Sequence, residues 1–402
     1  MTASSPTTDA LPLLSLPMGA VLLAQFFSAF GDNALLITAI ALVKAEGHLT
    51  WIPLLQAFFV IPFILLAPFV GALADAFPKG RVMLFANGLK LIGASSMAAG
   101  LPPLLCYGMA GVGAAAYSPA KYGILSQLFG PEKLVRANGM LEGSTIVAIL
   151  LGVLVGGWLA DFSINHAFAG VIGVYALAAA INLLIPRLPP EHALDRFDAP
   201  GLLRQFLSSL RVLWRDPDSR FSLIGTSLFW GTGSTLRLVL FAWVPVALGI
   251  ASNQMPANLM GVVSIGIVIG AMLAGWLVKL QQVNRALLGG LLLGPLVLLF
   301  AQQTALLPTA VLLTAIGAAG GFFVVPLNAL LQECGHKSIG AGHALAVQNL
   351  WENLVMLLFV GTYSLVSGLP VINVVTGFGA VVFVGLAVLA LARLTARHET
   401  AT

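Results

Sequence analysis

Six charged side chains lie inside apolar stretches that are long enough to cross a membrane. They are Asp32, Lys90, Lys121, Glu142, Arg237 and Glu352. An ionised group at mid-membrane depth costs about 3 kcal/mol on insertion scales unless it finds a partner, water or a substrate. Three of the six are basic and three are acidic, so they can pair with little net charge. We therefore expect them to face a polar interior instead of lipid.

Asp32 belongs to a polar stripe on the first apolar stretch. Gln25, Ser28 and Asp32 stand at i, i+3 and i+7, on one helical face, and Asn33 follows directly. Arg237 lies at a similar predicted depth in a later stretch. An Asp32–Arg237 pair suits a zwitterionic head group, because a guanidinium binds phosphate through two hydrogen bonds and a carboxylate can meet an ammonium. A purely structural latch is the competing interpretation.

A second acid–base pair is predicted nearer the cytoplasm, between Lys121 and Glu142. Tyr117 precedes Lys121 on the same helical face and is included in this binding site. Glu352 is flanked by Gln348 and Asn353, and it either lines a cavity or anchors its helix to a latch. For Lys121 and Glu142 as well, a structural role stays open.

The composition restricts the class of protein. Of the 402 residues, 59% are hydrophobic and only 8% are charged, and the mean hydropathy is +0.98. Soluble domains carry about a quarter charged residues. We therefore predict an all-α polytopic membrane protein. The two cysteines, Cys106 and Cys334, provide neither a disulfide framework nor metal-ligand spacing, so we expect no metal and no cofactor. The net charge of +4 is explained by the placement of basic residues in a membrane topology and does not indicate nucleic-acid binding.

Twelve transmembrane helices are predicted from the apolar stretches. They span residues 16–43, 51–75, 81–100, 104–127, 134–160, 166–186, 220–248, 256–279, 285–302, 307–331, 341–367 and 370–392. Nearly all basic residues of the connections fall on one side, and only Lys44 falls on the other. The positive-inside rule then places both termini in the cytoplasm. The first residues lack Lys or Arg, which favours a retained first span over a cleaved signal peptide.

The spans divide into two pseudo-symmetric six-helix bundles. We predict an N-terminal bundle at 1–187, a cytoplasmic linker at 188–219 and a C-terminal bundle at 220–402. The linker contains an amphipathic basic helix, Leu202–Arg215, suited to the surface of an anionic leaflet. In transporters built from parallel repeats the substrate site lies near mid-membrane between the halves.

A short cytoplasmic segment resembles the signature loop of the major facilitator superfamily. It carries Gly71, Asp75, Lys79 and Arg81, and it departs from the usual pattern at Ala76 and Pro78, where a basic residue and a glycine are common. The resemblance implies the major facilitator fold and a charge latch on the cytoplasmic side. The residues predicted to support this latch are Asn87, Lys90, and Lys279 and Arg285 of the second half.

Longer segments resemble the bacterial lysophospholipid transporters. They are Leu22–Phe26, Phe30–Leu36, Phe77–Met83, Gly113–Gly123 and Ala137–Glu142. The resemblance implies that lysophosphatidylethanolamine, with lysophosphatidylglycerol as a further substrate, crosses the bacterial inner membrane to the cytoplasmic leaflet. It also implies coupling to an acyltransferase/acyl-ACP synthetase on the cytoplasmic side that reacylates these lipids.

Enzyme and ATPase motifs are missing from the sequence. It contains no Gly-Lys pair, hence no phosphate loop, no His-x4-Asp acyltransferase pattern and no Gly-x-Ser-x-Gly elbow. We therefore expect a transporter and no enzyme. Two alternatives remain: a proton-coupled exporter of drugs or small metabolites that uses Asp32 or Glu142 as proton carrier, and a non-transporting scaffold whose Leu202–Arg215 helix docks an enzyme.

Overall fold

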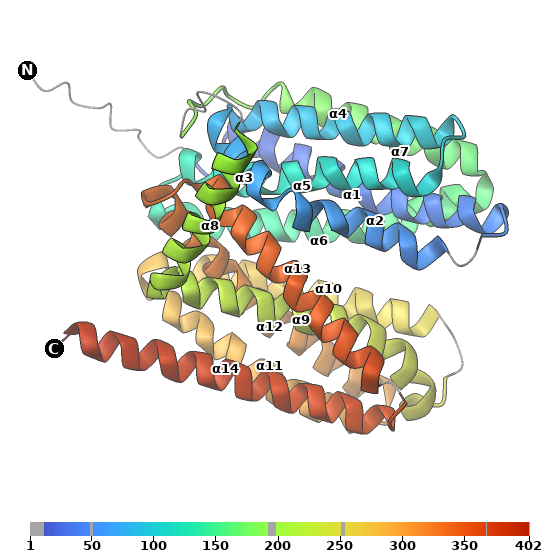
Figure 1. Ribbon diagram of the computed structural model, residues 1–402. Coiled ribbons are helices and arrows are strands. Elements are labelled where there is room, and N and C mark those ends of the chain that lie inside the picture. Colours follow the sequence, from blue (N-terminus) through green and yellow to red (C-terminus); the bar gives the residue numbers. More distant parts are fainter. Residues whose placement is uncertain (1–11, 49–50, 192–197, 251–253, 367, 402) are drawn as a thin grey trace, which may run out of the picture.

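Long helices make up nearly all of the computed structural model, which describes residues 12–48, 51–191, 198–250, 254–366 and 368–401 (Figure 1). The helices are α1 (Leu16–Ala45), α2 (Ile52–Leu65), α3 (Ala67–Ala76), α4 (Lys79–Ala98), α5 (Pro103–Leu128), α6 (Pro131–Phe162), α7 (Ile164–Asn182), α8 (Ala199–Arg215), α9 (Pro217–Leu248), α10 (Gln254–Leu277), the short 3-10 helix η2 (Leu280–Arg285), α11 (Ala286–Ala301), α12 (Leu306–Lys337), α13 (Ala341–Val366) and α14 (Val371–Ala401). No strand occurs among the described residues, so the all-α class is confirmed.

Each of the twelve predicted spans corresponds to one long helix or, for the second span, to the bent pair α2 and α3. By length and composition, nine helices of the described chain qualify as membrane-crossing, or ten with the bent pair as one span. The two that fall short are α4 and α5, although they have 20 and 26 residues. Their mean hydropathy is lowered by polar side chains such as Asn87, Lys90 and Lys121, which the fold buries or partly buries.

The second span is bent by 63° between α2 and α3. Pro68 stands in the first turn of α3 and Pro62 inside α2. A proline cannot donate the helical hydrogen bond and its ring clashes with the preceding turn, which breaks a helix at this point. The bend sends α3, with Gly71 and Asp75, toward the start of α13.

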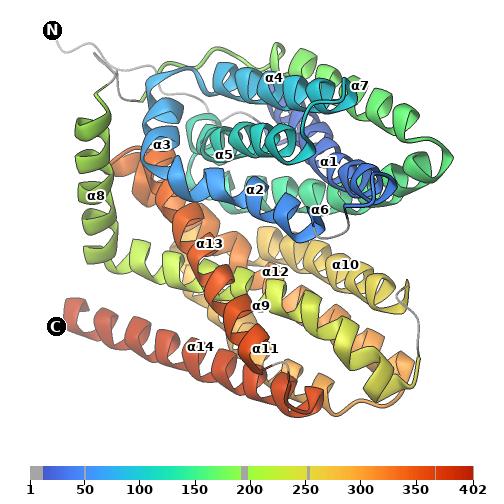
Figure 2. The same cartoon turned by 45° about the vertical axis from the view of Figure 1, so that its right-hand side comes forward.

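The helices form two groups, α1–α7 and α9–α14, which lie one above the other in Figures 1 and 2. The groups pack against each other mainly through α6 with α10 and through α3 and α5 with α13. The backbones approach closely at the first of these contacts: a Cβ added to Gly139 would lie 2.8 Å from the carbonyl oxygen of Ala271. The bundle boundaries at residues 187 and 219 stay a prediction.

The amphipathic linker helix predicted at Leu202–Arg215 is α8, and it lies across one end of the molecule (Figure 2). Leu202, Phe206 and Leu213 are buried, and the helix contacts α3, α9 and α13. Trp214 stacks on Trp351 of α13. We call this end of the molecule the α8 end and the opposite end the far end.

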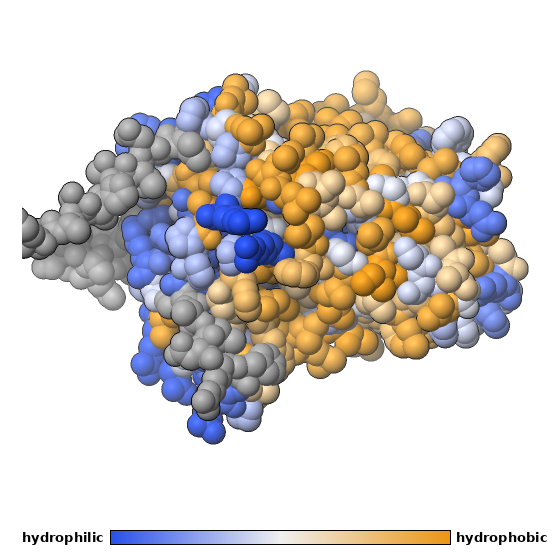
Figure 3. All heavy atoms as spheres, turned by 90° about the horizontal axis from the view of Figure 1, so that it is seen from above, coloured by the Kyte–Doolittle hydropathy of each residue, from blue (hydrophilic) through white to orange (hydrophobic). Residues whose placement is uncertain are grey.

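Apolar side chains form a broad band between two hydrophilic ends (Figure 3). Within the described part of the chain, large apolar residues such as Leu154, Leu358 and Leu391 are more than 60% exposed. A surface of this kind is stable only in lipid. The chain is a multi-pass membrane protein.

Candidate functional site

Asp32 lies near the middle of α1 and has two partners from neighbouring helices of the same group. The ammonium of Lys90 on α4 donates to Asp32 Oδ2 at 2.7 Å, and the hydroxyl of Tyr175 on α7 donates to Oδ1 at 2.8 Å. The Asp32 side chain keeps 19% of its surface exposed, whereas Lys90 keeps 2%. The carboxylate is therefore held in one orientation and stays accessible from one side.

Lys90 is the centre of this cluster and is almost fully enclosed. Its ammonium also donates to Ser28 at 2.9 Å, and it lies 5.0 Å from the ring centre of Tyr117 and 6.0 Å from that of Tyr175. Aromatic faces stabilise a desolvated cation, which explains how the lysine is tolerated inside the protein. The prediction that Lys90 braces the Asp75 loop is wrong, because α4 turns this side chain toward α1.

The other polar residues of α1 mainly join helices within the first group. Gln25 donates to Thr145 of α6 at 3.0 Å, and Ser28 donates to Asn87 of α4 at 2.7 Å. Asn87 therefore supports the Asp32 cluster and not the predicted latch. Asn33 donates to Ala29 of its own helix at 2.8 Å.

Arg237 does not form the predicted ion pair with Asp32. Its side chain is exposed, and no ion-pair partner for it occurs in the part of the chain that the structure describes. It is close enough to Tyr107 of α5 for its charge to act on that residue, so the guanidinium lies toward the α1–α7 group. The cationic partner of Asp32 is Lys90, whereas depth alone predicts Arg237.

A second cluster links the two groups through buried carboxylates and amides. Glu142 on α6 accepts hydrogen bonds from the hydroxyl of Tyr122 and, at 3.2 Å, from Asn328 of α12. Gln348 of α13 donates to Asn328 Oδ1 and to Glu352, both at 2.7 Å. A continuous chain of hydrogen bonds thus connects Glu142 with Glu352 across the interface, and Glu352 belongs to this cluster instead of the latch.

Lys121 lies beside this cluster without the predicted ion pair to Glu142. Its ammonium lies 4.5 Å from the ring centre of Tyr122, the residue that donates to Glu142. Among the described residues no carboxylate lies within ion-pair distance of it.

The predicted latch residue Asp75 binds the first turn of α13. It is fully buried, and it accepts the backbone N–H groups of Gly342 at 2.7 Å and His343 at 3.0 Å. The Nδ1 atom of His343 lies 2.6 Å from its Oδ2. Asp75 thereby satisfies free N–H groups at a helix start and complements its positive dipole.

Glycines are required where α3 meets α13. A Cβ at Gly71 would lie 2.9 Å from the Cβ of Ala346, and a Cβ at Gly342 would lie 2.5 Å from Asp75 Oδ1. Both distances are shorter than van der Waals contact. The glycines let Asp75 reach the backbone of the opposite group.

Lys79 extends the latch to Glu191, a residue just before the part of the linker that the structure leaves undescribed. The buried ammonium lies 3.3 Å from Asp75 and 3.2 Å from Glu191. Glu191 also accepts from the backbone of Ala341 at 2.9 Å and lies 3.3 Å from His336 Nδ1. Burial alone would raise the pKa of the Glu191 carboxyl, but these hydrogen bonds and the Lys79 charge outweigh it and lower the pKa to about 2.

The other predicted latch residues lie outside this network. Arg81 and Lys279 are exposed and have no ion pair among the described residues, and Arg285 donates only to the carbonyl of Leu277 at 3.4 Å. The carboxylates and the lysine of the latch therefore come from the first half and the linker, and the second half contributes the start of α13 and His336. An amide pair, Asn138 with Gln332, adds a further link between the groups at 2.6 and 2.9 Å.

The polar links between α1–α7 and α9–α14 all lie toward the α8 end in the described chain. Besides those above, Ser118 and Asn349 hydrogen-bond to each other at 3.0 Å. These links come from the end of α3, the second half of α5, the start of α6, the end of α12 and the first turns of α13. The structure is therefore closed at the α8 end.

The residues that sequence reasoning missed are mostly uncharged. Tyr175, Asn328 and Gln348 carry no charge, so a search for ions inside apolar stretches does not find them. Glu191 stands in the linker and His343 at a helix start, where polar residues are common. The sequence offers a signal only for Gln348, which stands four residues before Glu352.

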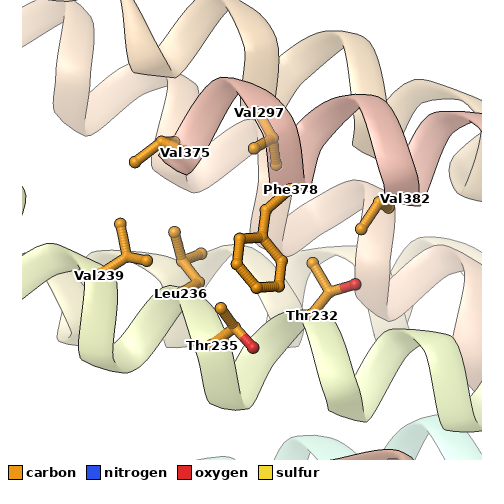
Figure 4. A pocket seen from close by; sticks show the side chains of 8 residues that line it. All are labelled: Thr232, Thr235, Leu236, Val239, Val297, Val375, Phe378 and Val382. Atoms are coloured by element: carbon orange, nitrogen blue, oxygen red, sulfur yellow. The ribbon is translucent and has the colours of Figure 1, made fainter. Parts of the chain in front are cut away.

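A small apolar pocket lies between α9, α11 and α14, and it is too small for a lipid head group (Figure 4). Phe378 points between Leu236, Thr235 and Thr232, and the free volume of about 20 Å³ corresponds to roughly one water. The hydroxyl groups of Thr232 and Thr235 donate to carbonyls of their own helix. The pocket is a packing defect.

Comparisons with known proteins agree on the class. The family model described as Major Facilitator Superfamily matches residues 21–359. The Lysophospholipid transporter LplT of Escherichia coli O6:K15:H31 (strain 536 / UPEC) is 55% identical over 371 residues, which cover 92% of this chain and 94% of that protein. The Lysophospholipid transporter LplT of Shigella boydii serotype 4 (strain Sb227) is 54% identical over the same shares.

Solved structures share the fold at low sequence identity. The human organic anion transporter MFSD10 (TETRAN) superimposes with a TM-score of 0.76 and 17% identity, covering 94% of this chain and 100% of that one. The transporter FucP in the outward conformation superimposes with a TM-score of 0.72 and 14% identity, covering 94% of this chain and 98% of that one.

Proposed function

Because the chain belongs to the major facilitator superfamily and, within it, to the lysophospholipid transporters, we propose that it carries lysophosphatidylethanolamine across the bacterial inner membrane. The protein is a transporter and not an enzyme. The observation that carries the choice of substrate is the arrangement of Asp32 and Arg237. One is an oriented carboxylate with an accessible side, and the other is an exposed guanidinium without a partner among the described residues.

We propose that these two residues receive the two charges of the head group. The Asp32–Lys90 pair is neutral as a unit, so Arg237 supplies the net positive charge that attracts the lipid phosphate. The ammonium of the lipid then approaches the accessible side of Asp32, while Lys90 and Tyr175 keep the carboxylate in place. Gln25 and Asn33 complete the polar face of α1. Lysophosphatidylglycerol, which lacks the ammonium, would use Arg237 alone.

We call Asp32 with Arg237 the first head-group station. A second head-group station lies toward the α8 end. Lys121 offers a phosphate partner, and Glu142 or Glu352 offers a partner for the ammonium. Tyr117 separates the two stations, since its ring contacts Lys90 and it precedes Lys121 by about one helical turn on α5. Movement of the head group from Arg237 to Lys121 requires the Glu142–Asn328–Gln348–Glu352 chain to open.

We further propose that the α8 end faces the cytoplasm, with both termini on that side. The basic residues of the connections gather there, which the positive-inside rule associates with the cytoplasm. The bundles 1–187 and 220–402 would then separate at the Asp75 latch and release the lipid into the cytoplasmic leaflet. There an acyltransferase/acyl-ACP synthetase would restore the second acyl chain.

Uptake of labelled lysophosphatidylethanolamine into vesicles that contain the purified protein tests the proposal. We expect Arg237→Ala and Asp32→Ala to lower the initial uptake rate at least about tenfold, because each removes a charge-assisted contact. Arg204→Ala, on the exposed face of α8, is the matched control and should transport normally.

Equal uptake by all variants would contradict the assignment of the head-group site. Absence of lipid uptake together with export of a small solute that follows an imposed pH gradient would favour the alternative, a proton-coupled exporter. Normal uptake by a variant with both Asp32 and Arg237 neutralised would show that these two charges have no role in lipid transport.

A further inference from the structure

A cavity of about 300 Å³ opens at the α8 end, between the start of α4 and the chain that follows α7. Its volume is at the lower end of the range for small-molecule sites. Arg81, Asn182 and Arg187 contribute polar groups to its wall, and Phe85 and Leu183 contribute apolar ones. None of these residues belongs to the two head-group stations or contacts the Asp75 latch.

Asn182, the last residue of α7, is the strongest sign of a missing ligand. Only 3% of its surface is exposed, and neither the oxygen nor the nitrogen of its amide has a hydrogen-bond partner. A buried amide left unpaired costs about 1–3 kcal/mol. A polar group bound in the cavity would remove this cost.

Two guanidinium groups give the cavity its charge. Arg81 and Arg187 are exposed, and neither has an ion-pair partner in the described chain. The wall contains no acidic side chain. The first turn of α4, with Gly80, also faces the cavity and adds the positive end of a helix dipole. All of these features favour an anion.

The mouth of the cavity is apolar. Phe85 is 72% exposed and Leu183 is 70% exposed, and both line the cavity. The face built by α4 and α7, seen from above in Figure 3, carries hydrophilic side chains close to the apolar band toward the α8 end. An occupant that has an anionic group and a hydrocarbon chain matches both parts of the wall.

We propose that this cavity binds the phosphate group of an anionic phospholipid from the leaflet at the α8 end. Arg81 and Arg187 bind the phosphate oxygens, and the Asn182 amide donates to the head group. The acyl chains lie along Phe85 and Leu183 on the outside of α4 and α7. A net negative lipid fits better than a zwitterionic one, because no carboxylate of the wall can receive an ammonium. This site is separate from the two head-group stations.

A bound phosphate would link Arg81, at the start of α4, to Arg187, in the segment after α7. Glu191 follows Arg187 by four residues and belongs to the latch, in which it binds Lys79 and the first turn of α13. The bound lipid is therefore expected to stabilise the protein in its closed form at the α8 end.

The test counts lipids on the full-length protein in detergent. Native mass spectrometry with phosphatidylglycerol or phosphatidylcholine shows retained lipids, and thermal unfolding with each lipid measures protection. We expect phosphatidylglycerol to bind and to raise the unfolding temperature, and phosphatidylcholine to do neither. Arg81→Gln/Arg187→Gln and, separately, Asn182→Leu should weaken phosphatidylglycerol binding at least about tenfold, since each removes hydrogen bonds to a charged group.

The matched control is Lys279→Gln/Arg285→Gln, which removes two exposed basic residues at the corresponding turn of the second half. It should bind phosphatidylglycerol like the wild type. Asn182→Leu keeps the size of the side chain and removes an unpaired amide, so it should fold even if the double arginine variant does not.

Three results would overturn the proposal. One is unchanged phosphatidylglycerol binding by Asn182→Leu and by the arginine variant, and the second is an equal loss in the Lys279 and Arg285 control. The third is full protection by inorganic phosphate alone, which would mean that the cavity takes a free anion and no lipid.

Discussion

The ion pair with Lys90 determines the orientation in which Asp32 can meet a ligand. The lysine is enclosed by Ser28 and the rings of Tyr117 and Tyr175, and Asp32 is its only carboxylate partner within the described residues. A buried ion pair contributes little net stability compared with an apolar pair, but removal of one member leaves an uncompensated charge. The pair therefore orients Asp32 for a ligand and does not serve mainly as a source of stability.

This view predicts an asymmetry between single and double variants. Lys90→Met should lower the free energy of unfolding by about 3 kcal/mol, because it leaves Asp32 without its counter-charge. Asp32→Asn/Lys90→Met should recover most of that loss, since no charge remains. Thermal unfolding of the purified proteins in detergent measures both. Equal destabilisation by the single and the double variant would show that packing of the lysine chain matters more than its charge.

A second prediction at this scale concerns Glu191, whose pKa is lowered to about 2. A carboxyl with a lowered pKa stabilises the fold above its unfolded value, near 4.3, and this contribution is lost as the pH falls from about 4.5 to about 2. With a discount for its partial exposure, we expect Glu191→Gln to cost about 2 kcal/mol near pH 5. The difference between variant and wild type should shrink toward pH 3.

Thermal unfolding of both proteins across this pH range checks the Glu191 prediction. Because the Glu191 carboxylate also raises the pKa of His336, the difference should decrease as the pH rises through the range in which His336 loses its proton. A difference that does not shrink between about pH 4.5 and about pH 3 would contradict the prediction.

At the scale of elements, the start of α13 is the point at which the molecule is closed. Asp75 of α3 and Glu191 of the linker both accept backbone N–H groups of its first turn, and Lys79 of α4 lies between the two carboxylates. One helix start is thereby bound by the first half and by the linker. The bend between α2 and α3 makes this possible, because a straight second span would not bring Asp75 to this turn.

Locking α5 to α13 should therefore stop transport. Ser118 and Asn349 hydrogen-bond to each other across the interface. We expect Ser118→Cys/Asn349→Cys, made in a chain with Cys106→Ser and Cys334→Ser, to lose lipid uptake under oxidising conditions and to regain it on reduction. The single variant Ser118→Cys in the same chain is the control. Uptake that continues in the cross-linked protein would show that this contact does not have to open.

At the scale of the whole molecule, the fold follows from properties that the sequence displays directly. Apolar stretches of sufficient length become helices, so the twelve spans were predictable. The polar stripe with Asp32 was predictable too, because helical spacing determines which residues share a face.

Partner choice was harder to predict. Depth predicts a pair of Asp32 with Arg237, but α1 packs against α6 and α7, and the long side chain of Lys90 reaches Asp32 from α4, so Lys90 and Tyr175 are its partners. Lys121 likewise meets the ring of Tyr122 instead of Glu142. Depth along a helix can be read from a sequence, whereas the neighbours of each helix and the direction of its faces depend on the packing of the entire bundle.

The central claim is that Arg237 recognises the phosphate of the lipid while the oriented Asp32 recognises its ammonium. Equilibrium binding of lysophosphatidylethanolamine and of a monoacylglycerol, which has the chain but no charges, tests it on purified wild type and Arg237→Ala. We predict that the variant binds lysophosphatidylethanolamine at least about tenfold more weakly and the monoacylglycerol equally well. An equal loss for both lipids, or no loss for either, would contradict the account.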